Sequence, residues 1–244
     1  MSKKIISISI FLFILFFNYS QTEKELFDKA NLLFSNNKFT DAIIVYNTLL
    51  SAGYDNFTIN YNLGYSYDKI GRIGKSVYHF EKAFYYSPFK SDTIFFLNKL
   101  NKQIYHNDFD DGRYLDKIIL FIKPSIIFNI LIILLCIIMI FYILYIVVKN
   151  KKFYYLFFFT MVILFLFSAI SGVQYFRFYN TKGIITATKS ADLFLSPYLD
   201  TIISTIDEGK KVTIEKIEGD FVQVKIDDLL YGWLNKDSIK IIKY

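Results

Sequence analysis

Two long uncharged runs near the middle of the chain dominate its hydrophobic pattern. Residues 126–148 carry no charged side chain and neither do residues 153–175, while the short segment 149–152 (Lys-Asn-Lys-Lys) separates the two runs. At about 1.5 Å of rise per residue, either run is long enough for a helix to cross a hydrocarbon core of roughly 30 Å. Two buried helices of a soluble core are the alternative, but two such runs exceed what a chain of 244 residues needs for its core. The pattern therefore predicts two transmembrane helices.

Before these runs, between residues 23 and 88, the apolar positions have helical spacing and repeat with a period of 34 residues. Each copy has one small residue, a second small residue twelve positions later and an aromatic residue four further on: Ala30, Ala42 and Tyr46, then Gly64, Ser76 and Phe80. Small residues are needed where the two helices of a hairpin cross closely, and the aromatic side chain fills the space beside them. We expect two helical hairpins, followed by an amphipathic helix over residues 92–103 that caps the stack.

After residue 183 the pattern changes to period two, with turn residues at short intervals. This is typical of a small antiparallel β domain. Strands are predicted over residues 184–188, 193–195, 201–206, 211–217, 221–226, 231–234 and 239–242. About 60 residues in short strands is the size of a small barrel.

The charges give the chain a membrane topology. Of the formal net charge of +6, five charges come from Lys3, Lys4, Lys149, Lys151 and Lys152, which all flank apolar segments. Such flanking cations mark the cytoplasmic side of a membrane and do not form the basic stripe that nucleic acid requires. Residues 1–20 have the charged, apolar and polar regions of a signal peptide, with an uncleaved signal anchor as the alternative. Both versions place the helical repeats and the β domain outside the cytoplasm.

The predicted fold class is a multi-domain membrane protein with all-α, transmembrane and all-β parts. The expected organisation is a signal peptide (1–20), helical repeats with a capping helix (21–106), a linker and juxtamembrane segment (107–125), two transmembrane helices (126–148 and 153–175) around a cytoplasmic turn (149–152), and a β domain (176–244).

The sequence offers little chemistry for catalysis. The only histidines are His79, which we expect at the surface of a repeat helix, and His106, at a helix end. Cys136 is the single cysteine and lies within the first transmembrane run. No nucleophile elbow, glycine-rich phosphate loop or metal-ligand spacing is present. We therefore expect a protein that is not an enzyme and has no cofactor or metal site.

The helical part resembles a pair of tetratricopeptide repeats over roughly residues 22–89. The second copy carries Leu63-Gly64, Tyr67, Ala83 and Pro88 at the motif positions, whereas the first has Leu49 and Tyr54 in place of the late Ala and Pro. The resemblance implies a concave groove that binds an extended protein segment. By repeat position, it would be lined by Lys24, Phe27, Asn31, Phe34, Thr58, Tyr61, Tyr65, Asp68 and Lys69. The alternative is that the aromatic residues only complete a small core, since two repeats are fewer than the three usually needed.

The β domain resembles the bacterial SH3-like domain. The matching features, in order, are Ser196-Pro197, Glu208-Gly209-Lys210-Lys211-Val212, Phe221-Val222-Gln223-Val224 and Tyr231-Gly232-Trp233-Leu234. The segment before Pro197 departs from the family, which usually has an Arg and a Gly there. The resemblance implies a groove for protein or cell-wall peptides, lined by Tyr198, Phe221, Tyr231 and Trp233. Alternatively, Trp233 belongs to the core or rim of the barrel.

The order of all these parts resembles the BatE-type proteins of the Bat (Bacteroides aerotolerance) group. The resemblance implies a scaffold in the bacterial cytoplasmic membrane, acting in an envelope complex linked to aerotolerance and stress. Its implied partners are membrane proteins with von Willebrand A domains and a MoxR-type ATPase system, together with the lipid bilayer. The alternative is a cell-wall-binding anchor that holds peptidoglycan and recruits a wall-processing enzyme.

Overall fold

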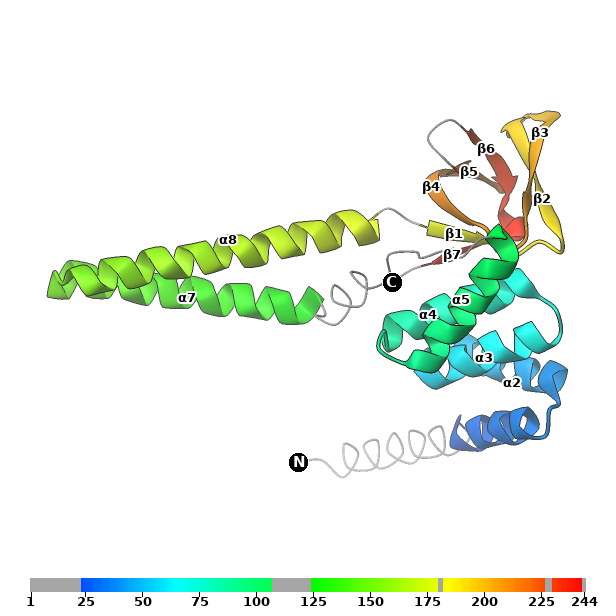
Figure 1. Ribbon diagram of the computed structural model, residues 1–244, viewed down its shortest axis with the longest axis horizontal. Helices are drawn as coiled ribbons and strands as arrows, with labels where there is room; N and C mark the ends of the chain where they lie inside the picture. Colours follow the sequence, from blue (N-terminus) through cyan, green and yellow to red (C-terminus); the bar gives the residue numbers. More distant parts are fainter. Residues whose placement is uncertain (1–22, 107–123, 180–181, 227–229, 243–244) are drawn as a thin grey trace, which may run out of the picture. The chain divides into compact units, whose positions relative to one another are not determined.

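The structure is a computed structural model that describes residues 23–106, 124–179, 182–226 and 230–242 (Figure 1). The chain forms two compact units. One contains the helical repeats together with the β-sheet, and the other contains the two long apolar helices. The predicted signal peptide and most of the predicted juxtamembrane segment lie outside the described residues.

The helical part of the first unit is a series of helices joined by short turns. A helix over residues 23–35 is followed by α2 (Phe39–Ser51), α3 (Phe57–Lys69), α4 (Ile73–Tyr86) and α5 (Ser91–Tyr105). The side chain of Asn56 caps α3 by accepting a hydrogen bond from the Ile59 amide at 3.0 Å. Gly53 and Gly71, in the turns before α3 and α4, have positive φ angles of 92° and 73°, which suits glycine.

The small residues of the 34-residue pattern lie where helices cross. Ala30, Ala42 and Ser76 are completely buried. A Cβ atom on Gly64 would lie 2.9–3.0 Å from the ring of Phe80, closer than such contacts normally occur. The Ser76 hydroxyl donates to the Gly64 carbonyl oxygen at 2.7 Å, which fixes α4 against α3 at this crossing. The physical reason for the small residues is therefore as the sequence predicted.

The β-sheet has seven antiparallel strands in the described residues, in the order β3-β2-β6-β5-β4-β1-β7. The strands are β1 (Lys182–Ile185), β2 (Ser190–Ser196), β3 (Leu199–Asp207), β4 (Lys211–Glu218), β5 (Phe221–Lys225), β6 (Tyr231–Asn235) and β7 (Ile239–Ile242). Every predicted strand is present, with ends that differ by a few residues. The largest difference is in β1, which ends early because the amides of Thr186 and Ala187 both donate to the Ser238 carbonyl.

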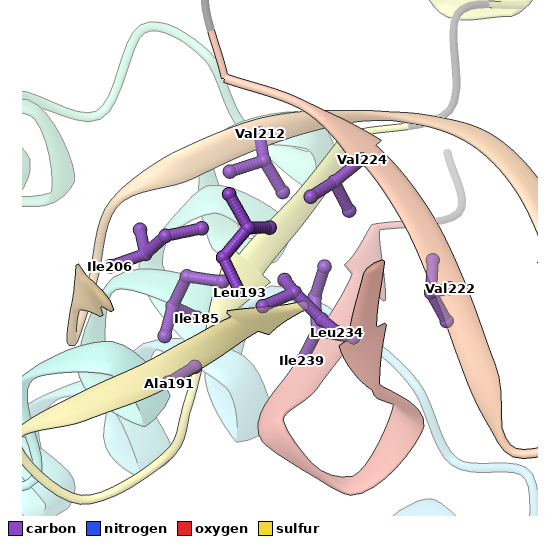
Figure 2. Close-up of a cluster of buried hydrophobic side chains, with 9 residues drawn as sticks. All are labelled: Ile185, Ala191, Leu193, Ile206, Val212, Val222, Val224, Leu234 and Ile239. Carbon is purple, nitrogen blue, oxygen red and sulfur yellow. The ribbon is translucent and has the colours of Figure 1, made fainter. Parts of the chain in front are cut away.

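The core of the sheet is a cluster of aliphatic side chains. Figure 2 shows Ile185, Ala191, Leu193, Ile206, Val212, Val222, Val224, Leu234 and Ile239 packed together. No aromatic side chain belongs to this buried cluster. Gly232 allows the strands to approach here, because a Cβ atom on it would lie 2.5 Å from Leu193 Cγ.

The first turn of α4 packs directly on the sheet. A Cβ atom on Gly74 would overlap the carbonyl oxygen of Ile185, so a larger residue does not fit without a shift. The Gly74 amide donates to Glu208 Oε1 at 2.9 Å, and this carboxylate lies in the turn between β3 and β4. The sheet therefore docks on the helical repeats through the backbone of α4.

Lys211, the first residue of β4, makes two further contacts with the repeats. Its Nζ atom lies 2.7 Å from Oε1 of the buried Glu81 on α4. Its backbone amide donates a hydrogen bond to the hydroxyl of Tyr105, the last residue of α5, at 3.2 Å. Polar contacts from both α4 and α5 thus hold the sheet in one orientation.

The second unit consists of α7 (Pro124–Val148) and α8 (Lys151–Tyr179), which pack against each other. Both helices are long and apolar enough to cross a membrane by length and composition. The turn between them is shorter than predicted, because Lys151 and Lys152 already belong to α8. Asn150 precedes the helix and accepts a hydrogen bond from the Lys152 amide at 3.0 Å.

Candidate functional site

Aromatic rings from three helices form a continuous surface on the repeats. We define the aromatic surface as Phe34, Tyr61, Tyr65, Phe95 and Phe96, from the helix over residues 23–35, α3 and α5. The ring centroids of Phe34 and Tyr65 are 5.5 Å apart, those of Tyr65 and Phe96 are 5.4 Å apart, and those of Tyr61 and Phe96 are 6.2 Å apart. The three contacts are edge-to-face, a favourable geometry for aromatic pairs.

The structure brings most of the predicted groove residues near this surface, with different exposures. Lys24, Thr58 and Lys69 are exposed, whereas Phe27, Asn31, Phe34, Tyr61, Tyr65 and Asp68 are half-buried. Phe27 and Phe34 also pack against the core of the first hairpin. The rings of Phe27 and Phe34 are therefore partly exposed, as a binding surface requires, and also complete the core of the first hairpin.

Two polar residues of the predicted groove, Asn31 and Asp68, bond to other side chains of the protein. Asn31 Oδ1 accepts a hydrogen bond from the Tyr46 hydroxyl at 2.7 Å, and Asn62 Nδ2 donates to that hydroxyl at 2.8 Å. Burial raises the pKa of Tyr46 to about 12, although the Asn62 hydrogen bond opposes this. Asp68 pairs with Lys99 of α5 at 2.9 Å. Asn31 and Asp68 thus hold the helices together rather than presenting free ligand groups.

Helix α5 contributes two residues to the aromatic surface, Phe95 and Phe96, that the sequence prediction missed. Phe95 is 64% exposed, while its neighbour Phe96 packs on Phe80 with ring centroids 5.1 Å apart. The 34-residue period could have found them, because Phe27, Tyr61 and Phe95 are spaced by 34 residues. The sequence predicted only that this helix caps the stack. Its place in the 34-residue period and its ring contacts with α3 are those expected for the first helix of a third hairpin.

Lysine side chains lie over several of these rings. Lys69 Nζ is 5.1 Å from the centroid of Tyr65, and Lys99 Nζ is 5.8 Å from that of Phe96. Ammonium groups at this range are attracted to the negative face of a ring. The surface therefore combines exposed aromatic area with cations placed on its rim.

On the sheet, the face opposite the core carries a row of large side chains across four strands. Strand alternation buries Leu193 and Leu234 and turns Phe194 and Trp233 to the other face. Phe194 pairs in register with both Ile202 and Trp233, and Trp233 pairs with Gln223. The Phe194 and Phe221 rings meet edge-to-face, with centroids 6.3 Å apart. Phe194 was missed because residues 193–195 are all apolar, so alternation does not tell which of them face the core.

The four residues predicted for the SH3-like groove differ in exposure and in their neighbours. Trp233 and Phe221 are half-buried on this outer face. Tyr231 is 45% exposed and has Lys225 Nζ 5.5 Å from its ring centroid. Tyr198 is 80% exposed between β2 and β3, and its hydroxyl donates to Glu218 Oε1 at 2.7 Å.

The prediction that His79 lies at the surface is wrong. It is only 6% exposed and stacks on Tyr67, with ring centroids 5.5 Å apart. Its Nδ1 atom lies 3.0 Å from Asn60 Oδ1, so the ring donates there, and Asn60 Nδ2 in turn donates to Asp55 at 2.5 Å. Burial, with a smaller effect from Lys82, lowers the pKa of His79 to about 3. This histidine is a neutral part of an interior polar network.

Comparison with known proteins adds no family to this geometry, since no protein-family model and no curated protein matches the chain.

Proposed function

We propose that the protein is a non-catalytic, membrane-anchored scaffold that binds a protein segment on its aromatic surface. The observation that carries the proposal is the exposed Phe95, at a position 34 residues after Tyr61. It lies beside Phe96, whose ring contacts Tyr61 and Tyr65. Aromatic side chains supply much of the energy of protein interfaces because they bury a large area with few rotatable bonds. The helical hairpins are proposed to be tetratricopeptide repeats, and the sheet an SH3-like domain.

The contacts between repeats and sheet support the proposed topology. The ion pair of Glu81 with Lys211 joins residues that precede and follow α7 and α8 in the chain. Two docked parts must lie on one side of a membrane, which requires an even number of crossings between them. Two transmembrane helices meet this requirement. With the lysines of the turn in the cytoplasm, the repeats and the sheet lie outside it.

The proposed partners come from the resemblance to BatE-type proteins. These are membrane proteins with von Willebrand A domains, and with them a MoxR-type ATPase system, in an envelope complex linked to aerotolerance. The exposed part of the aromatic surface, with Lys69 over the ring of Tyr65, suits an extended segment that carries aromatic and acidic side chains.

The test is site-specific photocrosslinking in cells. A photoreactive phenylalanine analogue replaces Phe95, and in a matched control it replaces Ile44, which is 62% exposed on α2. The proposal expects crosslinks to von Willebrand A-domain membrane proteins from position 95 and not from position 44. Equal crosslinking from both positions, or none from position 95, would contradict it.

The outer face of the sheet favours a second candidate function. Trp233 and Phe194 form a half-exposed aromatic pair, and such pairs also bind cell-wall peptides or sugars. In this alternative the protein is a wall anchor that recruits a wall-processing enzyme. Detergent-solubilised full-length protein would then co-sediment with purified peptidoglycan, and Trp233→Ala would abolish the co-sedimentation. If wild type and Trp233→Ala both stay in the supernatant, the wall-anchor function is contradicted.

A further inference from the structure

The β2–β3 hairpin extends beyond the core of the sheet. Its last core residues are Leu193 and Ile206, which belong to the buried cluster (Figure 2). From residue 194 to residue 205, no side chain is buried. We call residues 194–205 the arm. At the edge of the sheet, β3 pairs with β2 alone among the described strands (Figure 1).

The arm exposes four large aliphatic side chains. Leu195, Leu199 and Ile202 are 57%, 54% and 52% exposed, and Ile203 is 40% exposed. An isolated two-stranded ribbon is marginally stable, and clustered exposed apolar side chains commonly mark an interaction site. The arm is nonetheless held in place, because the Tyr198 hydroxyl bonds to Glu218 at its tip.

The register of the hairpin argues against simple strand addition at β3. The pairing shifts between Leu193 and Phe194 and again between Phe194 and Ser196, with the extra residues on β3. Such bulges twist an edge strand and block pairing with another strand. The arm is therefore suited to packing through its side chains rather than through backbone hydrogen bonds.

Charge selects the kind of partner. The hairpin from Ser190 to Asp207 contains three aspartates, Asp192, Asp200 and Asp207, and no lysine or arginine. Asp207 pairs with Lys210 at 2.8 Å, whereas Asp192 and Asp200 are exposed on the same two strands as the apolar side chains. A second copy of the arm would bring like charges together, and an anionic lipid surface would repel them.

We propose that the arm docks against an apolar protein segment that carries lysine or arginine side chains. The apolar residues of the partner would cover Leu199 and Ile202, and its cations would face Asp192 and Asp200. Because Ile202 pairs with Phe194, and Phe194 pairs with Trp233, the contact reaches the only tryptophan of the chain. Trp233 is thus a built-in reporter of docking.

The experiment uses full-length protein in a non-ionic detergent and two tryptophan-free synthetic peptides. One peptide alternates Leu with Lys, and the other has Glu in place of every Lys. Titration is followed by Trp233 emission. We expect the Lys peptide to change the emission and the Glu peptide to leave it unchanged. Leu199→Ser with Ile202→Ser should weaken binding roughly tenfold or more, and Ile70→Ser, at an exposed isoleucine outside the arm, should leave it unchanged.

The charge contribution is measured with Asp200→Asn, which keeps the size of the side chain. This variant should bind the Lys peptide several-fold more weakly and with a smaller dependence on salt. Emission of the free variants that matches the wild type establishes that the arm is intact. Equal binding of the two peptides, or unchanged affinity in both arm variants, would overturn the proposal. Arm-dependent dimerisation, or binding to phosphatidylglycerol vesicles in preference to the Lys peptide, would overturn it as well.

The inference rests on the proposed scaffold function, since both require protein partners, but the two can fail separately. Peptide binding by the arm is measured on purified protein. Crosslinking from position 95 concerns a different surface and is measured in cells.

Discussion

At the scale of single residues, polar groups in the repeats serve the interior rather than a substrate. Asp55, Asn60 and His79 form a chain of hydrogen bonds between the start of α3 and the middle of α4. Lys82 pairs with Asp55 at its outer end. Burial disfavours the Asp55 carboxylate, but hydrogen bonds from Lys82 and Asn60 and the charge of Lys82 outweigh this and lower its pKa. A buried network of this kind stabilises the fold only while every member keeps its protonation state.

We expect His79 to make the stability of the repeats depend on pH. The folded protein holds the His79 pKa at about 3, while the unfolded chain has the ordinary value of 6.5. As the pH falls below 6.5, the unfolded state binds a proton that the folded state cannot, so stability falls. The loss should reach about 2 kcal/mol between about pH 8 and about pH 5. Thermal unfolding at the two pH values measures it.

His79→Asn is the matched variant, because its amide keeps an N–H donor for Asn60 without a titrating ring. It should lose most of this pH dependence. Asp55 contributes little in this range, because its ordinary pKa of 3.8 lies well below pH 5 and the folded protein lowers it further. The same loss of stability between the two pH values in wild type and variant would show that His79 is not the source.

At the scale of elements, one face of α5 packs into the core of the repeats and the other face is exposed. Leu97 and Leu100 are completely buried, and their face completes the core of the second hairpin. Phe95 lies on the exposed face and meets the ring of Phe96, which in turn contacts the rings of Tyr61 and Tyr65 on α3. Two hairpins alone are short of the usual minimum for a stable repeat array. Helix α5 and the docked sheet both bury further side chains of the two hairpins.

The two faces of α5 should respond differently to truncation. Leu97→Ala removes a fully buried side chain and should lower the free energy of unfolding by about 2–5 kcal/mol. Phe95→Ala removes a side chain that is 64% exposed and should change stability by less than about 1 kcal/mol. Denaturant unfolding of the two variants provides the comparison. A large loss of stability in Phe95→Ala would assign that ring to the core.

At the scale of the whole molecule, the docked sheet ties together segments on either side of α7 and α8. The Gly74 amide on Glu208, the Glu81 carboxylate on Lys211 and the Tyr105 hydroxyl on the Lys211 amide are all contacts of this kind. In each contact, α7 and α8 lie between the two residues in the sequence. A chain that crossed the membrane only once between these parts could not form them.

Labelling of single cysteines tests this arrangement in cells. In a Cys136→Ser background, cysteines replace the exposed Lys24, Tyr198 or Asn150 in turn. A membrane-impermeant maleimide added outside the cytoplasmic membrane should label positions 24 and 198 but not position 150. Permeabilising the membrane should make position 150 reactive, which shows that it is exposed. Labelling of only one of positions 24 and 198 would be incompatible with the docked unit.

Much of this fold could be predicted from the sequence because its periodicities are strong. The two uncharged runs, the spacing of Ala30 and Gly64, and the alternation after residue 183 each have a direct physical cause. The docking of α4 could not be predicted, because nothing local marks Gly74 as a contact site rather than a turn glycine. His79 was placed wrongly for a similar reason. A polar residue can be buried when its partners, here Asn60 and Tyr67, come from another helix.

The contact between α4 and the sheet also bears on how tightly partners are held. It keeps the aromatic surface and the arm within one compact unit, so a partner with two binding segments can engage both at once. For a tethered second segment, the effective concentration is of millimolar order. Two sites with dissociation constants of about 100 μM each would then act together with an apparent constant of about 10 μM. Loosening the α4 contact would lower this avidity without altering either surface.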